Sequence, residues 1–170
     1  MHVKQLRAAS VQGSLAPFRK GFPVRVTKRT NIAIRVLMYC AMNDDRLVTK
    51  HEIAERCNAS ENHLAQVVHQ LAQLGYLRTQ RGRHGGLGLA RPARAIQIGA
   101  VFRALEAPVP IAECFADTDN TCPLKEGCRL RTALTDAIET FFAHLDEITL
   151  DALVCDNPRL EALLAPATCR

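Results

Sequence analysis

The sequence predicts a mainly α fold with a small β wing: a winged helix-turn-helix domain, a cysteine loop and a long helix. Two helical segments joined by a short turn, over residues 49–74, carry the first part of this prediction. A Gly-rich basic hairpin follows them directly, over residues 76–90. An apolar stripe at helical spacing over residues 129–153 is longer than a small winged domain needs.

Residues 1–23 contain two glycines, two prolines and no sustained periodicity, so we expect a disordered extension there. Strong structure resumes at Val24, and we expect translation to start there from an alternative start codon. The next segment, residues 29–43, is a strongly apolar helix candidate that Asn43 ends. The winged domain is expected to occupy residues 24–106.

Thr49 and Glu52 form a capping box that opens a short helix through about Cys57. Ser60 is a natural N-cap for the next helix, predicted over residues 61–74. One face of this second helix is apolar, at Leu64, Val67, Val68, Leu71 and Leu74. The arrangement is that of a helix-turn-helix, with residues 61–74 as the recognition helix.

A strand is predicted from Tyr76 to Gln80, a hairpin tip over residues 81–86, and a return strand from Leu87 to Ala90. Such a hairpin directly after a recognition helix is a wing. A further helix is expected over residues 98–106, and the cysteine loop over residues 107–128. Together these elements complete the winged domain and lead into the cysteines.

Charge is distributed unevenly along the chain. Residues 1–106 hold 17 Lys and Arg against 6 Asp and Glu, a net +11, whereas residues 107–170 hold 5 against 11, a net −6. The first part should therefore be attracted to polyanions. No apolar run reaches the length of a membrane span, and no secretory signal is visible, so a cytoplasmic protein is expected. Seven cysteines then suit ligands and buried thiols better than disulfides.

The polar face of the recognition helix is rich in groups that can hydrogen-bond base edges in a major groove. The wing adds cationic side chains that can clamp phosphates or enter a minor groove. We expect double-stranded DNA to be bound by Ser60, Asn62, His63, Gln66, Arg81, Arg83 and His84. An ordinary solvated helix face and a charged turn are the alternatives, but the two features in this order favour DNA.

The stripe over residues 129–153 predicts one continuous helix. Its apolar positions are Leu130, Leu134, Ile138, Phe141, Phe142, Leu145, Ile148, Ala152 and Leu153. We expect residues 129–154 to act as a dimerisation helix that pairs with a second copy in a two-fold homodimer. A dimer would present two recognition helices to a near-palindromic operator. Residues 155–170 are expected to form a C-terminal tail.

Cys114, Cys122 and Cys128 lie on a polar stretch with the spacing C-x7-C-x5-C. The C-x2-C pairs of structural zinc sites are absent, and long spacers suit a larger cofactor such as an iron–sulfur cluster. The fourth ligand is left open among Glu113, Asp117, Asp119, His144 and a residue of a partner subunit. Zinc and three buried thiols are the alternatives. Cys40 and Cys57 suit structural roles instead.

Several motifs resemble the Rrf-type iron–sulfur regulators, a family of bacterial winged-helix repressors and activators. They are V-R-V-T-K-R-T-N-I-A-I-R-V-L at 24–37, S-E-N-H-L at 60–64, L-A-Q-L-G-Y-L at 71–77, R-G-R-H-G-G-L-G-L-A-R-P at 81–92, I-G-A-V-F-R-A-L-E at 98–106, and the cysteine loop. The resemblance covers about residues 24–154. It implies a transcriptional repressor, not an enzyme.

Within this family the chain is most similar to the nitric-oxide-sensing repressors, through E-N-H-L-A-Q-V-V-H-Q-L, A-E-C-F and T-L-D-A-L-V. The resemblance implies a [4Fe-4S] cluster on Cys114, Cys122 and Cys128, with [2Fe-2S] possible. Nitric oxide, as the signal, would damage the cluster and derepress nitric oxide detoxification genes. The chain departs from some relatives at Asn31, where they carry an acidic residue that could reach a partner's cluster.

Two other functions stay open at this point. The x7 spacer is also similar to that of the iron-responsive branch of the family, which implies a cluster-bearing repressor of iron uptake genes. A metal-thiolate redox protein without DNA binding is the alternative from another class. No nucleophile–base pairing or phosphate-cradling loop supports an enzyme.

Overall fold

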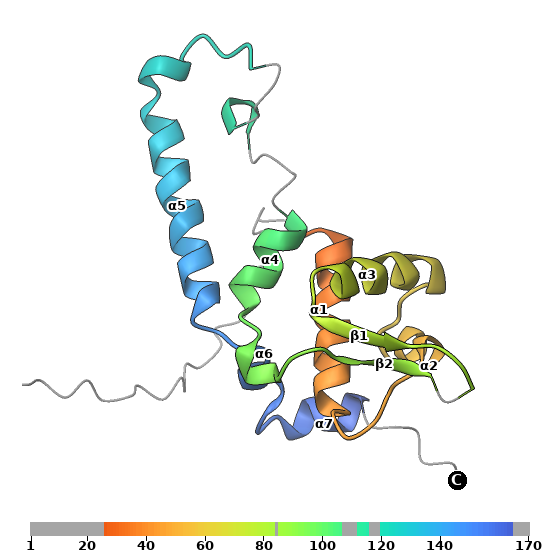
Figure 1. The fold of residues 1–170 in the computed structure, drawn as a ribbon. Coiled ribbons are helices and arrows are strands. Elements are labelled where there is room, and N and C mark those ends of the chain that lie inside the picture. The colour runs from red at the N-terminus through yellow and green to blue at the C-terminus, as the bar shows by residue number, and fades with distance from the viewer. Residues whose placement is uncertain (1–25, 84, 107–111, 116–119, 165–170) are drawn as a thin grey trace, which may run out of the picture.

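The computed structural model describes residues 26–83, 85–106, 112–115 and 120–164 (Figure 1). The described helices are α1 (Lys28–Met42), α2 (Lys50–Arg56), α3 (Glu61–Gln73), α4 (Ile98–Glu106), α5 (Arg129–Asp146), α6 (Leu150–Val154) and α7 (Pro158–Leu164). The strands are β1 (Leu77–Gln80) and β2 (Gly86–Leu89), and short 3-10 turns lie at η1 (Ala93–Ala95), η2 (Glu113–Phe115) and η3 (Lys125–Gly127). The predicted mainly α fold with a small β wing is confirmed.

Helix α1 is the centre of the hydrophobic core. It contacts α3 and β2 on one side and α4 and α6 on the other (Figure 1). Its buried residues are Thr30, Ile32, Ala33, Val36, Leu37, Tyr39 and Cys40. Thr27 caps the helix, because its side chain accepts a hydrogen bond from the Thr30 amide at 3.2 Å. The apolar segment predicted over residues 29–43 thus packs against α3, β2, α4 and α6.

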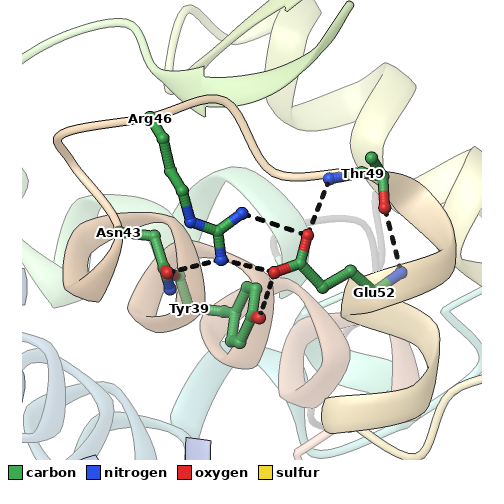
Figure 2. A network of polar contacts seen from close by, with 5 residues as sticks. All are labelled: Tyr39, Asn43, Arg46, Thr49 and Glu52. Carbon is green, nitrogen blue, oxygen red and sulfur yellow. Dashed lines mark hydrogen bonds and ion pairs between the residues drawn. The ribbon is translucent and has the colours of Figure 1, made fainter. Parts of the chain in front are cut away.

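The capping box predicted at the start of α2 is confirmed. The Thr49 hydroxyl accepts from the Glu52 amide at 3.2 Å, and the Glu52 carboxylate accepts from the Thr49 amide at 3.3 Å. Figure 2 shows that the same carboxylate also accepts from the Tyr39 hydroxyl, at 2.8 Å, and from the Arg46 guanidinium. The pKa of Glu52 falls to about 2, chiefly because of the hydrogen bonds from Arg46. One side chain thereby ties the end of α1 to the start of α2.

The turn between α2 and α3 is tight. Asn58 has a φ of 47°, in the left-handed region that Asn tolerates better than most residues. The Ala59 amide donates to the Ala54 carbonyl at 3.0 Å, which closes the end of α2. Helix α3 ends in the same way at Gly75, with a φ of 71°. The helix-turn-helix predicted over residues 49–74 is therefore present.

The wing is a two-stranded antiparallel hairpin in which Leu77 pairs with Leu89 and Gln80 with Gly86. Val48, between α1 and α2, extends it through hydrogen bonds of 2.9 and 2.8 Å with Leu87. A Cβ atom added at Gly86 would lie 2.8 Å from the Val48 carbonyl oxygen. The hairpin is thus fastened to the helix-turn-helix at a point where only glycine fits.

The prediction of one continuous helix over residues 129–153 is wrong. Helix α5 ends at Asp146, and α6 begins at Leu150. Between them, the Ile98 amide donates to the Ile148 carbonyl at 2.9 Å and the Leu150 amide donates to the Ile96 carbonyl at 2.8 Å. These hydrogen bonds to the segment before α4 replace those of a helix and turn the chain back toward α1.

The expected C-terminal tail contains one more helix, α7, which begins at Pro158 as helices often do. Asn157 precedes it and accepts a hydrogen bond from the Leu160 amide at 3.0 Å. Leu164 packs against the core. No helix in the described part of the chain is long and apolar enough to cross a membrane. The extension over residues 1–23, with the proposed start at Val24, lies outside the described residues.

Candidate nucleic-acid interface and cysteine segment

The first half of α3 presents a polar face to solvent. Ser60, Asn62, His63 and Gln66 are exposed, whereas the opposite face is buried in the core. Ser60 takes the N-cap position as predicted, but its hydroxyl makes no capping hydrogen bond and lies 3.1 Å from Nδ1 of His63. The four side chains expected to read bases therefore lie together on one exposed end of the recognition helix.

The tip of the wing carries two exposed arginines, Arg81 and Arg83. Gly82 separates them with a φ of 108°, which side-chain-bearing residues rarely adopt, and its carbonyl accepts from the Gly85 amide at 2.9 Å. A Cβ atom at Gly85 would lie 2.3 Å from the Gln80 carbonyl oxygen. The glycines thus fix a narrow tip that carries cationic groups on both sides of its turn. His84, also expected to contact DNA, lies outside the described residues.

A hollow of about 420 Å³ lies between α3, the start of α2 and the wing. Three basic or titratable side chains line it, from three elements: Lys50, His69 and Arg81. Its apolar residues are Ala65, Val68, Ala72 and Leu87. Lys50 was not predicted to lie on this surface. The sequence feature that could have indicated it is its position directly after Thr49, the N-cap of α2. The hollow thus separates α3 from the wing and is bordered by the cations Lys50 and Arg81.

A smaller hollow, of about 210 Å³, lies between α1 and α3. Lys28, Arg29 and Ile32 of the first turns of α1 face His63, Gln66 and Val67 of α3 across it. The start of α1 is therefore a direct neighbour of the recognition helix.

The C-terminal end of α3 is held by one arginine. Arg91 donates from Nε to the Gly75 carbonyl at 3.0 Å and from Nη2 to the Leu74 carbonyl at 3.2 Å. Its guanidinium also lies 4.7 Å from the centre of the Tyr76 ring. A cation at this end suits the helix dipole and the unpaired carbonyls there. Arg91 thereby fixes the angle between the recognition helix and the wing.

The cysteine segment runs from α4 to α5. Cys114 lies in η2, Cys122 follows Thr121, and Cys128 directly precedes α5. All three are half-buried and free. The described residues include no group of three or more Cys, His, Asp or Glu side chains close enough to hold a metal ion. The structure thus puts the three thiols on one segment without gathering them around one point.

Two contacts shape this segment. The Glu113 carboxylate accepts hydrogen bonds from the amide and the hydroxyl of Thr121, both at 2.7 Å, and so closes the spacer between the first two cysteines. The side-chain oxygen Oδ1 of Asn120 accepts a hydrogen bond from the Cys122 amide at 3.1 Å, while Nδ2 of the same side chain is buried without a partner among the described residues. A buried donor two residues before a cysteine suits a group with sulfur acceptors. The donor set and these contacts fit an iron–sulfur cluster.

The candidates for a fourth ligand differ in whether their side chains are free and close to the cysteines. The Glu113 carboxylate is engaged by Thr121. His144 lies 16 residues beyond Cys128 along α5, about 24 Å at 1.5 Å per residue. Asp117 and Asp119 lie outside the described residues. The distance removes His144 of the same chain as a ligand.

The two buried thiols outside the cysteine segment, Cys40 and Cys57, are kept protonated by their burial. Desolvation raises the pKa of Cys40 to about 12 and also raises that of Cys57. Because the thiolate is the form that binds metals, both belong to the core, as expected. Cys155 is exposed, and its hydrogen bond to Asp151 raises its pKa.

Residues 26–156 match the Rrf2 family, described as an iron-dependent transcriptional regulator. The chain belongs to the Rrf2 family. It is 41% identical over 142 residues to the HTH-type transcriptional regulator NsrR of Geobacillus kaustophilus, covering 83% of this chain and 97% of that protein. It is 40% identical over 141 residues to protein aau3 of Rhizobium meliloti, covering 83% and 92%.

Solved structures of Rrf2-type regulators share the fold. IscR of T. potens superposes with a TM-score of 0.66 at 22% identity, covering 86% of this chain and 95% of that one. CymR of B. subtilis, a global cysteine regulator, superposes with a TM-score of 0.58 at 26% identity, covering 77% and 96%. This chain is thus an Rrf2-family transcriptional regulator with a winged helix-turn-helix. The homologues NsrR, IscR and CymR are likewise transcriptional regulators and not enzymes.

Proposed function

We propose that this Rrf2 regulator is a homodimeric, cluster-bearing repressor that releases its operator when nitric oxide damages the cluster. One observation carries the proposal. An exposed polar face of α3 and an arginine-tipped wing lie on the same chain as a segment of three half-buried thiols. The first is suited to DNA, and the second to a reactive thiolate-bound cofactor.

The DNA contact is expected to divide into two parts. Asn62, His63 and Gln66 would hydrogen-bond base edges, since their side chains are exposed at the start of α3. Arg81, Arg83 and the cations of the larger hollow would contact phosphates. This division predicts that α3 substitutions change sequence preference, whereas wing substitutions change affinity for all sequences.

The dimer is proposed from α5. None of the 18 residues of this helix is buried, although the helix carries an apolar stripe. Leu130 is 65% exposed and Phe141 is 41% exposed. Figure 1 shows that the first half of α5 stands away from the winged body. A second copy of α5 would cover this stripe and place two recognition helices on one operator.

The cluster is proposed to be held by Cys114, Cys122 and Cys128. Three thiolates would leave one iron without a strong protein ligand, and that iron would be open to a small ligand such as nitric oxide. Glu113 would hold the first two cysteines in place through Thr121, and Asn120 would donate its buried N–H to sulfur. The fourth ligand is proposed to be Asp117, Asp119 or a residue of a partner subunit, because Glu113 is engaged by Thr121 and His144 of the same chain is too distant.

The test is anaerobic DNA binding by the reconstituted protein, titrated with a few equivalents of nitric oxide per cluster. We expect the affinity to collapse at low stoichiometry. A Cys122→Ala variant, which cannot hold the cluster, should bind the operator weakly in the absence of nitric oxide. A Cys155→Ala variant is the matched control, since this exposed thiol lies outside the segment.

An iron-responsive repressor is the second candidate, favoured by the C-x7-C-x5-C spacing. The same assay separates the two. If binding survives nitric oxide but is lost on iron chelation, the regulator answers to iron supply. Zinc without sulfide in the purified protein would contradict both candidates.

A further inference from the structure

The recognition helix and the wing are joined by a very short link. Helix α3 ends at Gln73 and β1 begins at Leu77. Within the link, Gly75 takes a φ of 71°, and the Tyr76 amide donates to the Leu71 carbonyl at 2.9 Å. The chain thus turns back on the end of α3 before it enters the wing. The angle between the two elements is set at this link.

Arg91 returns to the same link from the other end of the wing. Directly after β2, the Ala90 amide donates to the Tyr76 carbonyl at 3.0 Å, which closes the base of the hairpin. The Arg91 guanidinium then donates to the carbonyls of Gly75 and Leu74, at 3.0 and 3.2 Å. It also lies 4.7 Å from the centre of the Tyr76 ring. One side chain therefore bridges the base of the wing and the end of α3.

The guanidinium of Arg91 is directed at the backbone rather than at an acid. Among the described residues, no carboxylate lies within 4 Å of it. Its side chain is exposed, yet Nε and Nη2 both donate to main-chain carbonyls. A planar guanidinium can make two such bonds while it stacks on a ring, which a lysine ammonium cannot do. The contacts suit a residue that holds two elements in one arrangement.

The two elements that Arg91 joins are expected to touch DNA at their far ends. The base-reading residues Asn62 and Gln66 lie near the start of α3, whereas Arg91 grips the residues after its end. Arg83 lies at the tip of the wing, and Arg91 at its base. The four residues of β1 put the tip about 13 Å from the base, at 3.3 Å per residue. A change of angle at the base is therefore magnified at Arg83.

We propose that Arg91 is a positioning residue for DNA recognition, which holds α3 and the wing at one angle so that their base and phosphate contacts form together. The inference rests on the proposed function, which assigns bases to α3 and phosphates to the wing. Without Arg91, the bridge between Val48 and Leu87 still attaches the wing, so the wing pivots instead of detaching. Arg83 then no longer reaches its phosphate whenever α3 occupies the groove, and the two contacts lose their cooperation.

The experiment is a double-mutant cycle on the full-length, reconstituted protein, with a DNA duplex that wild type selects from a random-sequence pool as the probe. Arg91→Met keeps an unbranched stem beside Tyr76 and removes the guanidinium. Arg83→Ala should weaken binding in the wild-type background, and by at least about threefold less in the Arg91→Met background. Arg94→Ala, which removes an exposed arginine three positions along the chain, is the matched control. With it, the two losses should multiply.

Arg91→Lys keeps the positive charge and guards against an Arg91→Met protein that does not fold. It should also reduce the coupling to Arg83, because the ammonium cannot span both carbonyls and stack on the ring. Losses that multiply for both Arg91 variants would overturn the proposal, and a direct contact between Arg91 and a phosphate would give that result. Full wild-type coupling in Arg91→Lys would overturn it as well.

Failure of the proposed function has a different signature. If wild type selects no DNA sequence, or if Arg83→Ala alone leaves the affinity unchanged, the assignment of DNA contacts is wrong and this inference falls with it. If wild type selects a sequence and Arg83→Ala weakens binding, the proposed contacts stand, and only the coupling decides the role of Arg91.

Discussion

The guanidinium of Arg103, on α4, donates two hydrogen bonds to the carboxylate of Asp146, the last residue of α5, at 2.7 and 2.6 Å. The same guanidinium lies 4.7 Å from the centre of the Phe142 ring. Phe102 and Phe141 add an edge-to-face contact with centroids 6.3 Å apart. The end of the proposed dimerisation helix is therefore locked onto α4.

Gly99 is the residue that allows this close approach. A Cβ atom added there would lie 2.2 Å from a carboxylate oxygen of Asp146 and 2.9 Å from its amide nitrogen. Gly99→Ala should therefore lower the free energy of unfolding by about 1–3 kcal/mol, as overpacking does. Urea unfolding measures it. Gly127→Ala is the matched control, because a Cβ there meets nothing within 4 Å.

Adding Asp146→Ala to Gly99→Ala should recover only part of this loss. The side-chain clash is relieved, but the amide nitrogen remains close and the hydrogen bonds from Arg103 to Asp146 are lost. Full recovery would contradict the role given to the backbone contact. An unchanged stability in Gly99→Ala alone would show that α4 and α5 do not pack as described.

The Glu52 network predicts a specific dependence of stability on pH. The carboxylate has a pKa of about 2 when folded, below its ordinary value of 4.5, so it contributes stability above about pH 4.5 that is lost as the pH falls toward 2. Glu52→Gln should cost about 1–3 kcal/mol at pH 7, as lost charged hydrogen bonds do. The difference from wild type should shrink between pH 4.5 and pH 2.

The measurement is urea unfolding of both proteins at several pH values in that range. Glu55→Gln, one turn along α2 and exposed, is the matched control. A difference that stays constant down to pH 2 would mean that the Glu52 charge does not stabilise the fold.

Arg83 should contribute through phosphates rather than bases. Arg83→Ala is expected to weaken binding of operator and unrelated DNA alike, and to reduce the salt slope by about 0.9 for one phosphate contact. Affinities at several salt concentrations give the slope. Arg159→Ala, on α7, should leave both quantities unchanged. A loss confined to the operator would assign Arg83 to base recognition instead.

Glu113 offers a test of the cysteine segment itself. If it closes the spacer through Thr121, Glu113→Ala should lower iron and sulfide content after anaerobic reconstitution. Glu113→Gln should retain most of it, because an amide oxygen can still accept both hydrogen bonds. If Glu113 were instead an iron ligand, Gln would be as damaging as Ala. Glu126→Ala, exposed in the same segment, is the control.

Sequence reasoning succeeded where the signals are local. The capping box of Thr49 and Glu52, the turn before Ser60 and the bounds of α4 depend on residues a few positions apart. The basic wing likewise follows from neighbouring glycines and arginines. The exposed polar face of α3 could be expected because its apolar residues repeat at helical spacing.

The break between α5 and α6 could not be predicted in this way. The apolar stripe continues through Ile148, Ala152 and Leu153, and neither Pro nor Gly interrupts it. The chain turns because Ile148 and Leu150 bond to residues 96–98, some fifty positions earlier. The hydrogen bonds from the amide and the hydroxyl of Thr27 to the Glu106 carboxylate likewise join residues that are distant in sequence. Pairings of this kind appear only when the fold brings the segments together.

The return of α6 to the core has a consequence for how such regulators diversify. Leu150 is fully buried and α6 contacts α1, so the winged body is assembled from two separate stretches of chain. The cysteine segment and α5 form an insertion that leaves this body after α4 and returns to it at α6. Lengthening or shortening an insertion whose ends are fixed costs little free energy. A segment inserted there can be exchanged for another while the winged body keeps its shape, yet cutting the chain after Glu106 would remove α6 from that body.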